Sequence, residues 1–463
     1  MRERCGSLAL LFLAVSYPFT QSTSSIRQVS WTDLPVPLQK LLIARGINDA
    51  TLPAYLIDER ARTQARLREG DLDHVIYYAL QSRSFTSLPP IEPALSAKEF
   101  VDGLPAAERA RFLAGSANAV GRPVPRAVQA RLDDLAKALE TRTASAQLMG
   151  FRDIVARESS GQPAPELLRR QYRRAMRFLY QKEFGNPQPA GRGKAGDELY
   201  QARGLSTDTS VEAGYVVYLA LATLQRLEPK RRIRHALIVG PGLDVAPRTS
   251  LVETDAPQSY QPFAVMDALL GLGLSEPGTL RITAVDINPR VVEWLQRTRG
   301  ARPQLALATG LAETAAVRFT DDYLAYFAGL GRAIATSPPQ PERVRGRLTK
   351  LLDLSPGVTD AVDASPLDIV AERLDERYDL IVVTNVFPYL SDPDLLLALG
   401  NIARMLAPAG VLVHNEPRPL IGEVCFALGL PLIHSRSAVI ATVEGGKPPL
   451  YDAVWMHGKR EKG

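Results

Sequence analysis

The sequence predicts an α/β fold, in which a doubly wound sheet closes with a C-terminal antiparallel hairpin and follows an all-helical N-terminal domain. Short apolar segments alternate with helical segments after about residue 209, as strands and helices do around a parallel sheet. Two β-rich runs flank a Gly/Pro turn near the end of the chain, which is typical of a hairpin. Before residue 190, apolar residues recur at helical spacing and no strand pattern stands out.

The individual elements follow from local patterns. The predicted parallel strands are 236–239, 282–285, a weaker strand that ends near Asp363, 380–384 and 411–414. The helices predicted between them are 260–272, 290–297 and 394–406. The hairpin joins 437–443 to 451–457, and the clearest helices of the N-terminal domain are 126–139 and 166–179.

Composition divides the chain into four parts. Residues 1–25 have the form of a signal peptide, because a charged head precedes an apolar run and a small, polar stretch. We expect a helical domain at 26–184, a Gly/Pro-rich linker at 185–200 and the α/β domain at 201–463. The signal predicts an exported protein, with a cytoplasmic protein as the alternative. No transmembrane segment is predicted, since the apolar run is too short to span a bilayer.

The bulk composition excludes several classes of protein. The chain has 463 residues, of which 46% are hydrophobic and 23% are charged, as in ordinary globular proteins. A net charge of +5 is mild for this length, so nucleic-acid binding is not indicated. Two cysteines exclude a disulfide framework, and the five histidines lie too far apart in sequence for a metal-ligand motif. No metal site is therefore predicted.

Small and acidic residues mark a ligand site at the strand ends. The strand at 236–239 leads into a turn with Gly240 and Gly242 and then Asp244, and the next strand ends on Asp286. Glycines let a backbone pass close to a ligand, because no Cβ stands in the way. An acid at the tip of the neighbouring strand can accept hydrogen bonds from ribose hydroxyls. The sequence therefore predicts a site for a nucleoside-containing cofactor.

From about residue 209 to residue 459, the chain resembles the class I S-adenosylmethionine-dependent methyltransferases, which have a Rossmann-like fold. Residues 237–244 look like the glycine loop of that family, and Asp286 looks like its ribose-binding acid. Asp363 and the residue after it look like the pair that meets the adenine ring. The closing hairpin is similar to the reversed seventh strand of the family.

The resemblance implies S-adenosyl-L-methionine as the cofactor. It also implies that Asn385 ends the fourth strand, whose tip faces the methyl group, and that Asp244 lies near the ammonium group of the cofactor. The cofactor-binding residues implied are Gly240, Gly242, Asp244, Asp286, Ile287, Asp363, Ala364 and Asn385. Insertions after the glycine loop and between Asp286 and Asp363 depart from a compact member of the family, and we expect them to form a lid or a substrate wall.

Two residues are candidates for contact with the methyl acceptor. Tyr389 follows the predicted fourth strand and Glu416 follows the fifth. Tyrosine can pack on a substrate or donate a hydrogen bond, and Glu416 could take a proton from a nucleophile. Either residue could instead be an ordinary loop residue. The sequence does not name the acceptor, although a small molecule or a protein is favoured over nucleic acid.

Two alternatives to an active methyltransferase remain open at this point. The first is a methyltransferase-like domain that has lost catalysis and acts as a binding or scaffold protein, because an exported enzyme would lack a supply of the cytosolic cofactor. The second is a nicotinamide-dependent oxidoreductase with a Rossmann domain. Its fingerprint has a third glycine where this chain has Val245, and its acid lies closer to the glycines than Asp286 does.

Overall fold

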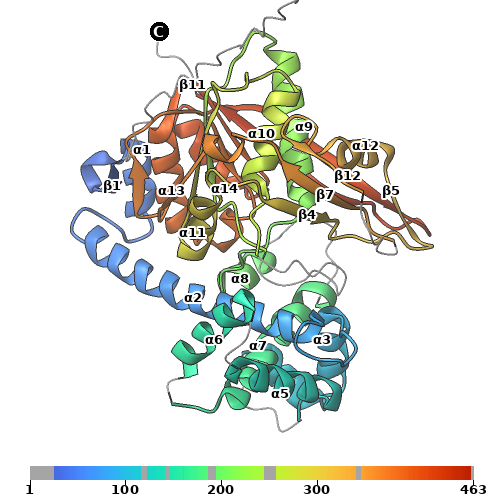
Figure 1. Ribbon diagram of the computed structural model, residues 1–463. Helices are drawn as coiled ribbons and strands as arrows, with labels where there is room; N and C mark the ends of the chain where they lie inside the picture. The colour runs from blue at the N-terminus through green and yellow to red at the C-terminus, as the bar shows by residue number, and fades with distance from the viewer. Residues whose placement is uncertain are drawn as a thin grey trace, which may run out of the picture.

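The computed structural model describes residues 25–115, 123–141, 145–159, 161–185, 194–244, 257–339 and 346–459. Figure 1 shows a sheet-containing part above a cluster of helices, with the long helix α2 (Leu52–Gln81) passing between them. The candidate signal peptide at 1–25 lies almost wholly outside the described residues. So does most of the predicted insertion after the glycine loop.

Within the described residues, the largest sheet has eight strands. Their spatial order is β5 (Val317–Phe319), β12 (Leu432–Val443), β13 (Leu450–Gly458), β11 (Leu406–His414), β10 (Tyr378–Val383), β2 (His235–Val239), β3 (Arg281–Asp286) and β8 (Val362–Pro366). Strands β11, β10, β2, β3 and β8 are parallel, and β13 runs antiparallel between β11 and β12. The predicted α/β sheet and its closing antiparallel hairpin are confirmed.

Both faces of the sheet are buried, which explains the continuous apolar runs of its strands. In β2, Ala236 and Ile238 point into one core, whereas Leu237 and Val239 point into another. Helices α9 (Val211–Leu227), α10 (Gln261–Gly271), α11 (Pro289–Thr298) and α12 (Asp321–Gly329) supply the first core. Helices α1 (Val36–Ile43), α13 (Asp392–Met405) and α14 (Pro419–Ala427) supply the second.

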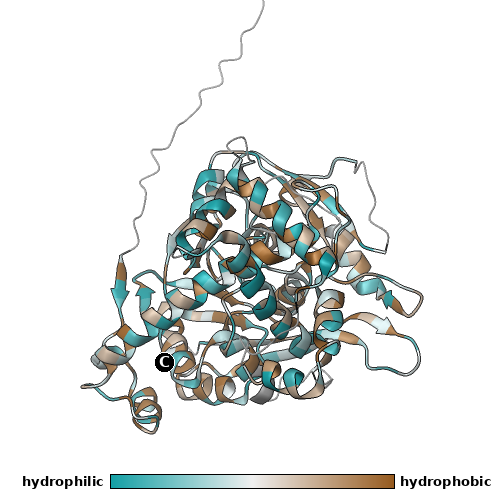
Figure 2. Cartoon of the chain, turned by 90° about the horizontal axis from the view of Figure 1, so that it is seen from below, coloured by the Kyte–Doolittle hydropathy of each residue, from teal (hydrophilic) through white to brown (hydrophobic). Residues whose placement is uncertain are grey.

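A third core joins the helices below the sheet. It is formed by the second half of α2 with α3 (Pro93–Asp102), α4 (Ala106–Leu113), α5 (Arg126–Glu140), α6 (Ala146–Ser159) and α7 (Ala164–Phe184). These helices carry both hydrophilic and hydrophobic residues (Figure 2), as expected of helices that bury one side. The helices predicted at 126–139 and 166–179 are α5 and the middle of α7.

The first described residues pack on the sheet rather than on the helical cluster. Strand β1 (Ile26–Gln28) pairs with β9 (Glu372–Leu374), and Leu38 and Leu42 of α1 join the core of α13. The chain before residue 184 is therefore not purely helical. The sequence could not show this, because a strand of three residues finds its partner almost 350 residues later. The domain boundaries themselves stay a prediction, although the proposed linker contains a helix, α8 (Lys194–Gln201).

A second, smaller sheet lies in the stretch between β3 and β8. It consists of β4 (Gln304–Ala308), β7 (Thr349–Leu354) and β6 (Ala335–Thr336) in that order. Short 3-10 helices occur at η1 (Trp31–Asp33), η3 (Thr359–Ala361) and η4 (Phe387–Tyr389). The small sheet accounts for the long spacing between Asp286 and Asp363. Across the part of the chain that the structure describes, no helix combines the length and the apolar character needed to cross a bilayer.

Candidate functional site

The carboxyl ends of four parallel strands border one cavity. Strands β2, β3, β8 and β10 run in the same direction, so their ends meet at one edge of the sheet, where ligands of open α/β sheets bind. We call this the first cavity. Its walls include Gly240, Gly242, Asp286, Ile287, Asn288, Leu367, Asp368, Thr384 and Asn385, together with Glu59, Thr63, Arg66 and Leu67 of α2.

The glycine turn after β2 has the backbone that glycine favours. Gly240 and Gly242 have φ angles of +66° and +76°, in the left-handed region. A Cβ on Gly240 would lie 2.5 Å from a methyl group of Val386, at the cavity wall. A Cβ on Gly242 would lie 2.3 Å from the carbonyl oxygen of Thr207. Gly242 is therefore required by a close approach of the protein's own chain.

Asp286 faces this turn from the end of β3. Its side chain is buried, and Oδ1 accepts a hydrogen bond of 2.8 Å from the backbone N–H of Asn288. Burial raises the pKa of Asp286 to about 6, although the backbone N–H groups of Asn288, Gly242 and Ile287 stabilise its ionised form. The structure thus brings Gly242, Asp286 and Ile287 together as the sequence predicted.

Asp244 lies outside the cavity wall. Its Oδ1 accepts a hydrogen bond of 3.2 Å from the backbone N–H of Thr209, and its backbone forms a bridge with Gln258. Thr207 completes this contact, because its carbonyl accepts a 2.8 Å bond from the N–H of Leu243. The sequence predicted that Asp244 approaches the cofactor, but the structure does not place it in the wall of the first cavity. Asp244 instead ties the glycine turn to the segment before α9.

The structure does not bring Asp363 and Ala364 to the cavity. The strand expected to end near Asp363 begins at Val362, and Asp363 pairs with Thr283 in the first half of β3. Its side chain is 51% exposed and forms an ion pair with Arg299. The chain reaches the cavity only after β8, at Leu367 and Asp368. The pattern Val-Asp-Ala-Ser-Pro misled the prediction because it is too polar to show where this strand ends.

Asn385 lies at the tip of β10 with a strained backbone. Its φ angle is +59°, in the left-handed region that is uncommon for residues with a side chain, although asparagine adopts it more readily than most. Asn415 holds it from both sides. The Asn415 side-chain oxygen accepts a hydrogen bond of 2.9 Å from the backbone N–H of Asn385. The Asn415 side-chain NH₂ donates a second hydrogen bond of 2.9 Å to Oδ1 of Asn385. This pairing leaves the side-chain NH₂ of Asn385 able to face a ligand.

The two candidates for acceptor contact have different positions. Tyr389 borders the first cavity, and its carbonyl accepts a 2.9 Å hydrogen bond from Arg66 of α2. Glu416 is 2% exposed and lies after β11, where its N–H donates to Nδ1 of His414 at 3.3 Å. Glu416 borders neither the first cavity nor the second cavity described below. A proton-transfer role for Glu416 is not supported by its position.

Helix α2 supplies site residues that the sequence analysis missed. Glu59 and Thr63 lie one turn apart and are hydrogen-bonded, with 2.6 Å between Thr63 Oγ1 and Glu59 Oε1. Burial and the neighbouring Asp368 raise the pKa of Glu59. The sequence does contain a signal for these residues. Glu59, Thr63 and Asp71 are spaced by four and by eight residues, which places polar side chains on one side of a helix. Such a stripe has the same form as a solvated face, and only the structure shows that it is buried.

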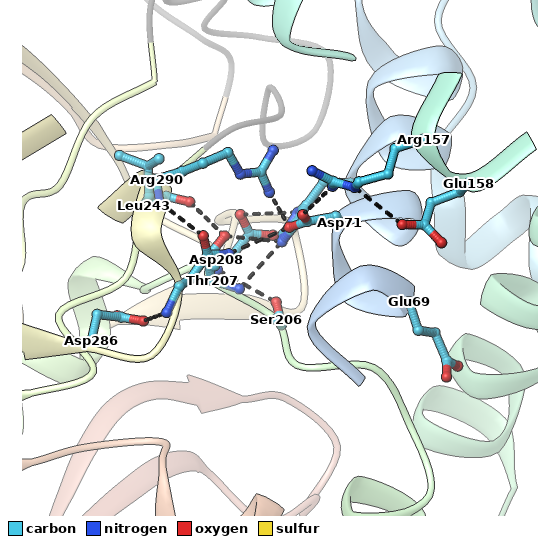
Figure 3. A network of polar contacts seen from close by, with 12 residues as sticks. Glu69, Asp71, Arg157, Glu158, Ser206, Thr207, Asp208, Leu243, Asp286 and Arg290 are labelled. Atoms are coloured by element: carbon cyan, nitrogen blue, oxygen red, sulfur yellow. Dashed lines mark hydrogen bonds and ion pairs between the residues drawn. The ribbon is translucent and has the colours of Figure 1, made fainter. Parts of the chain in front are cut away.

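A polar network connects α2 to the end of β3 (Figure 3). Asp71 of α2 lies between Arg290 of α11 and Arg157 of α6, and it pairs with both. Asp71 also accepts a 3.3 Å hydrogen bond from the side chain of Asn288, whose N–H binds Asp286. The helical part of the chain is thus connected to the predicted cofactor site through two side chains.

The first cavity is narrow. Its volume is about 120 Å³, whereas ligand pockets usually span roughly 300–1,000 Å³. The cause is α2, whose side chains lie over the carboxyl edge of the sheet. A larger groove of about 1020 Å³ lies between α9, α10 and α12, but no end of a parallel strand borders it. In the described residues, no group of three or more His, Cys, Asp or Glu side chains is arranged to hold a metal ion.

No protein-family model matches the chain. A stretch of 82 residues is 38% identical to Nodulation protein S of Rhizobium tropici, and it covers 18% of this chain and 31% of that protein. The chain thus spans about a third of the length of this curated relative.

Two solved structures of methyltransferases align with more than half of the chain. One is the N-methyltransferase NodS from Bradyrhizobium japonicum WM9 in complex with S-adenosyl-L-homocysteine, with 15% identity, a TM-score of 0.27 and coverage of 53% of this chain and 86% of that chain. The other is magnesium protoporphyrin IX methyltransferase from Synechocystis PCC 6803 with bound S-adenosylmethionine, with 8% identity, a TM-score of 0.27 and coverage of 60% and 93%. These scores are too low to define the fold, which the strand order defines instead. The chain resembles class I methyltransferases in its motif order and in its reversed strand β13.

Proposed function

We propose that this protein is an S-adenosylmethionine-dependent methyltransferase that binds its cofactor in the first cavity. The observation that carries the proposal is the position of Asp286. Its buried carboxylate faces the glycine turn at the carboxyl edge of the sheet, between the ends of β2 and β8. Burying an acid without a ligand costs free energy, as the raised pKa shows, and ribose hydroxyls would offset this cost by donating hydrogen bonds.

The wall residues suit the parts of this cofactor. Asp286 would accept hydrogen bonds from the ribose hydroxyls. Ile287 and Leu367 would offer apolar surface to the adenine ring. Asp368 replaces Asp363 as the acid nearest the ring. The turn at Gly240 and the amide of Asn385 border the remaining part of the cavity, where the methionine portion would lie.

The cofactor supplies a methyl group on a sulfonium centre, which is already a reactive electrophile. The protein's residues therefore mainly hold and orient the two reactants and keep water away. Helix α2 serves the last purpose, because Glu59, Thr63 and Leu67 cover the strand ends. The small volume of the cavity implies that these side chains move when the cofactor binds.

The nicotinamide alternative has less support. Rossmann dehydrogenases bind dinucleotides to a sheet with the strand order 3-2-1-4-5-6, whereas here the antiparallel β13 lies next to β11. No observation in the described residues favours an inactive scaffold over an enzyme.

Titration calorimetry of the purified full chain tests the proposal. We expect saturable heat with both S-adenosylmethionine and S-adenosylhomocysteine, and none with reduced nicotinamide adenine dinucleotide, which also carries an adenosine and is the cofactor of the alternative hypothesis. No heat with either adenosyl ligand would contradict the proposed function.

Export stays a separate proposal. It rests on the sequence of residues 1–25 alone. Fractionation of cells that express the full chain tests it, and a cytoplasmic, unprocessed protein would remove the conflict with a cytosolic cofactor.

A further inference from the structure

A second cavity of about 380 Å³ adjoins the first. It lies between α2, α7 and α8 on one side and the loop after β10 on the other. Ser206, Asp208, Asn385 and Tyr389 border both cavities. A molecule in the second cavity would therefore meet the first at these four residues, next to the tip of β10.

Aromatic rings form much of the wall of the second cavity. Phe178 and Tyr200 meet edge to face with 5.8 Å between ring centroids, and Tyr200 and Tyr389 do so at 5.6 Å. Tyr77 adds a fourth ring to the lining. Walls of this kind suit a ring-bearing small molecule, because rings stack on or against one another at such distances.

The cations at this cavity already face acids. Arg203 lies 3.8 Å above the ring of Phe178, and its guanidinium is 3.8 Å from the carboxylate of Asp73. Lys182 is 3.0 Å from Glu183. Neither Asp73 nor Glu183 is part of the cavity wall, so they compensate these positive charges from behind it.

Asp208 is the acid at the junction of the two cavities. Its Oδ1 lies 3.6 Å from Nδ1 of the buried His74. The other ring nitrogen, Nε2, accepts a 3.2 Å hydrogen bond from the N–H of Thr207, so the proton of the neutral ring lies on Nδ1, toward Asp208. Burial lowers the pKa of His74 to about 3, so the neutral imidazole lies beside the carboxylate without neutralising it.

We propose that the second cavity binds the methyl acceptor, and that this acceptor is a ring-bearing small molecule that presents an amine to Asp208. An amine reaches the protein as an ammonium ion, which Asp208 attracts, whereas a carboxylate nucleophile is repelled by Asp208. This inference rests on the proposed function. His74 acts as a positioning residue behind Asp208.

The transfer balances as follows. The ammonium nitrogen first loses a proton to Asp208 or to water. Its lone pair then forms the bond to the methyl carbon while the bond between sulfur and that carbon breaks. The electron pair of the broken bond stays on sulfur, which becomes a neutral thioether, and the methylated nitrogen carries the positive charge.

The test compares three ligands that differ in one group: benzylamine, benzyl alcohol and benzoate. Their affinities for the full chain, saturated with S-adenosylhomocysteine, are measured by ligand-observed NMR. We expect benzylamine to bind at least about fivefold more tightly than the other two, with a dissociation constant below about 10 mM. Equal or tighter binding of benzoate or benzyl alcohol, or no binding of benzylamine, would overturn the proposal.

Four variants separate this inference from the proposed function. Asp208→Asn should reduce the ratio of benzylamine to benzyl alcohol affinity to near one, and a ratio measured within one variant does not depend on how much of it folds. His74→Phe, which removes the Nδ1 proton, should lower the same ratio, and His74→Asn should restore part of it. Phe178→Leu, a change in the second cavity alone, should weaken all three ligands and leave the heat of S-adenosylhomocysteine binding unchanged. If wild-type protein binds no adenosyl ligand, the proposed function fails; if it does and the ratio is unaffected by Asp208→Asn, only the acceptor inference fails.

Discussion

Replacement of Asp286 by asparagine should weaken cofactor binding and at the same time change how stability depends on pH. The side chain keeps its shape and loses its charge. A hydrogen bond to a charged group contributes about 1.5–3 kcal/mol. Asparagine keeps one acceptor oxygen, so we expect the loss of about one such bond and of part of a second, or a roughly 100-fold weaker affinity for S-adenosylhomocysteine.

The pH dependence follows from the direction of the pKa shift. Burial raises the pKa of Asp286 from 3.8 to about 6, so the folded protein binds this proton more tightly than the unfolded chain does. The contribution of Asp286 to the stability of the ligand-free protein is therefore greatest below pH 4, and it is lost as the pH rises through about 6. The full loss is about 3 kcal/mol, and about half of it falls between roughly pH 5 and pH 7.5. Cofactor affinity should change in the opposite sense and rise about tenfold from pH 5 to pH 7, because the ribose binds the ionised carboxylate.

Calorimetry and chemical denaturation at the two pH values check both effects. Asp363→Asn is the matched control, since it makes the same chemical change at an exposed residue outside the cavity. The control should bind the ligand like the wild type and keep its pH dependence. Equal ligand affinity in wild type and Asp286→Asn, or a loss of affinity in Asp363→Asn as large as in Asp286→Asn, would refute the reasoning.

Three further predictions concern packing and the cover of the cavity. Gly242→Ala should destabilise the protein by about 2–5 kcal/mol in a denaturation assay, because it combines a left-handed backbone with a clash against a carbonyl oxygen. The control Gly271→Ala should be neutral, because no heavy atom lies within 4 Å of the added Cβ. Equal effects of the two substitutions would contradict this account. Gly70→Ala should also destabilise the protein, although alanine favours helices, because its Cβ would lie 1.8 Å from a backbone oxygen of the segment that crosses α2. A stabilised variant would show that this crossing is not present. In Glu59→Gln, stability should fall less than in the wild type as the pH rises from the acidic range to above neutral, since burial and Asp368 raise the pKa of Glu59. Parallel pH profiles of the two proteins would contradict the buried pairing of Glu59 with Asp368.

The parts of the site that sequence reasoning found are those with local causes. The strand at 236–239 is buried on both faces, so its apolar run is continuous, and Gly240 and Gly242 mark the turn that follows it. Asp286 ends a strand of the same kind. Each of these residues can be recognised from its immediate neighbours in the chain.

The parts that were missed depend on distant segments. The extent of β8 is set by its pairing with β3, so that Asp368 and not Asp363 lies in the wall of the first cavity. Asp244 has the expected sequence position, but it does not line the cavity, and its carboxylate accepts a hydrogen bond from the backbone N–H of Thr209. Helix α2, which covers the site, is crossed at Gly70 by the chain after α8, more than 130 residues away in sequence. Local patterns carry no information about such contacts.

A crystal structure of the full chain with S-adenosylhomocysteine tests the central claim most directly. We expect the ribose hydroxyls within hydrogen-bond distance of the Asp286 carboxylate and the adenine ring between Ile287 and the residues after β8. A nucleoside bound elsewhere, or Asp286 without contact to the sugar, would contradict the assignment of the first cavity as the cofactor site.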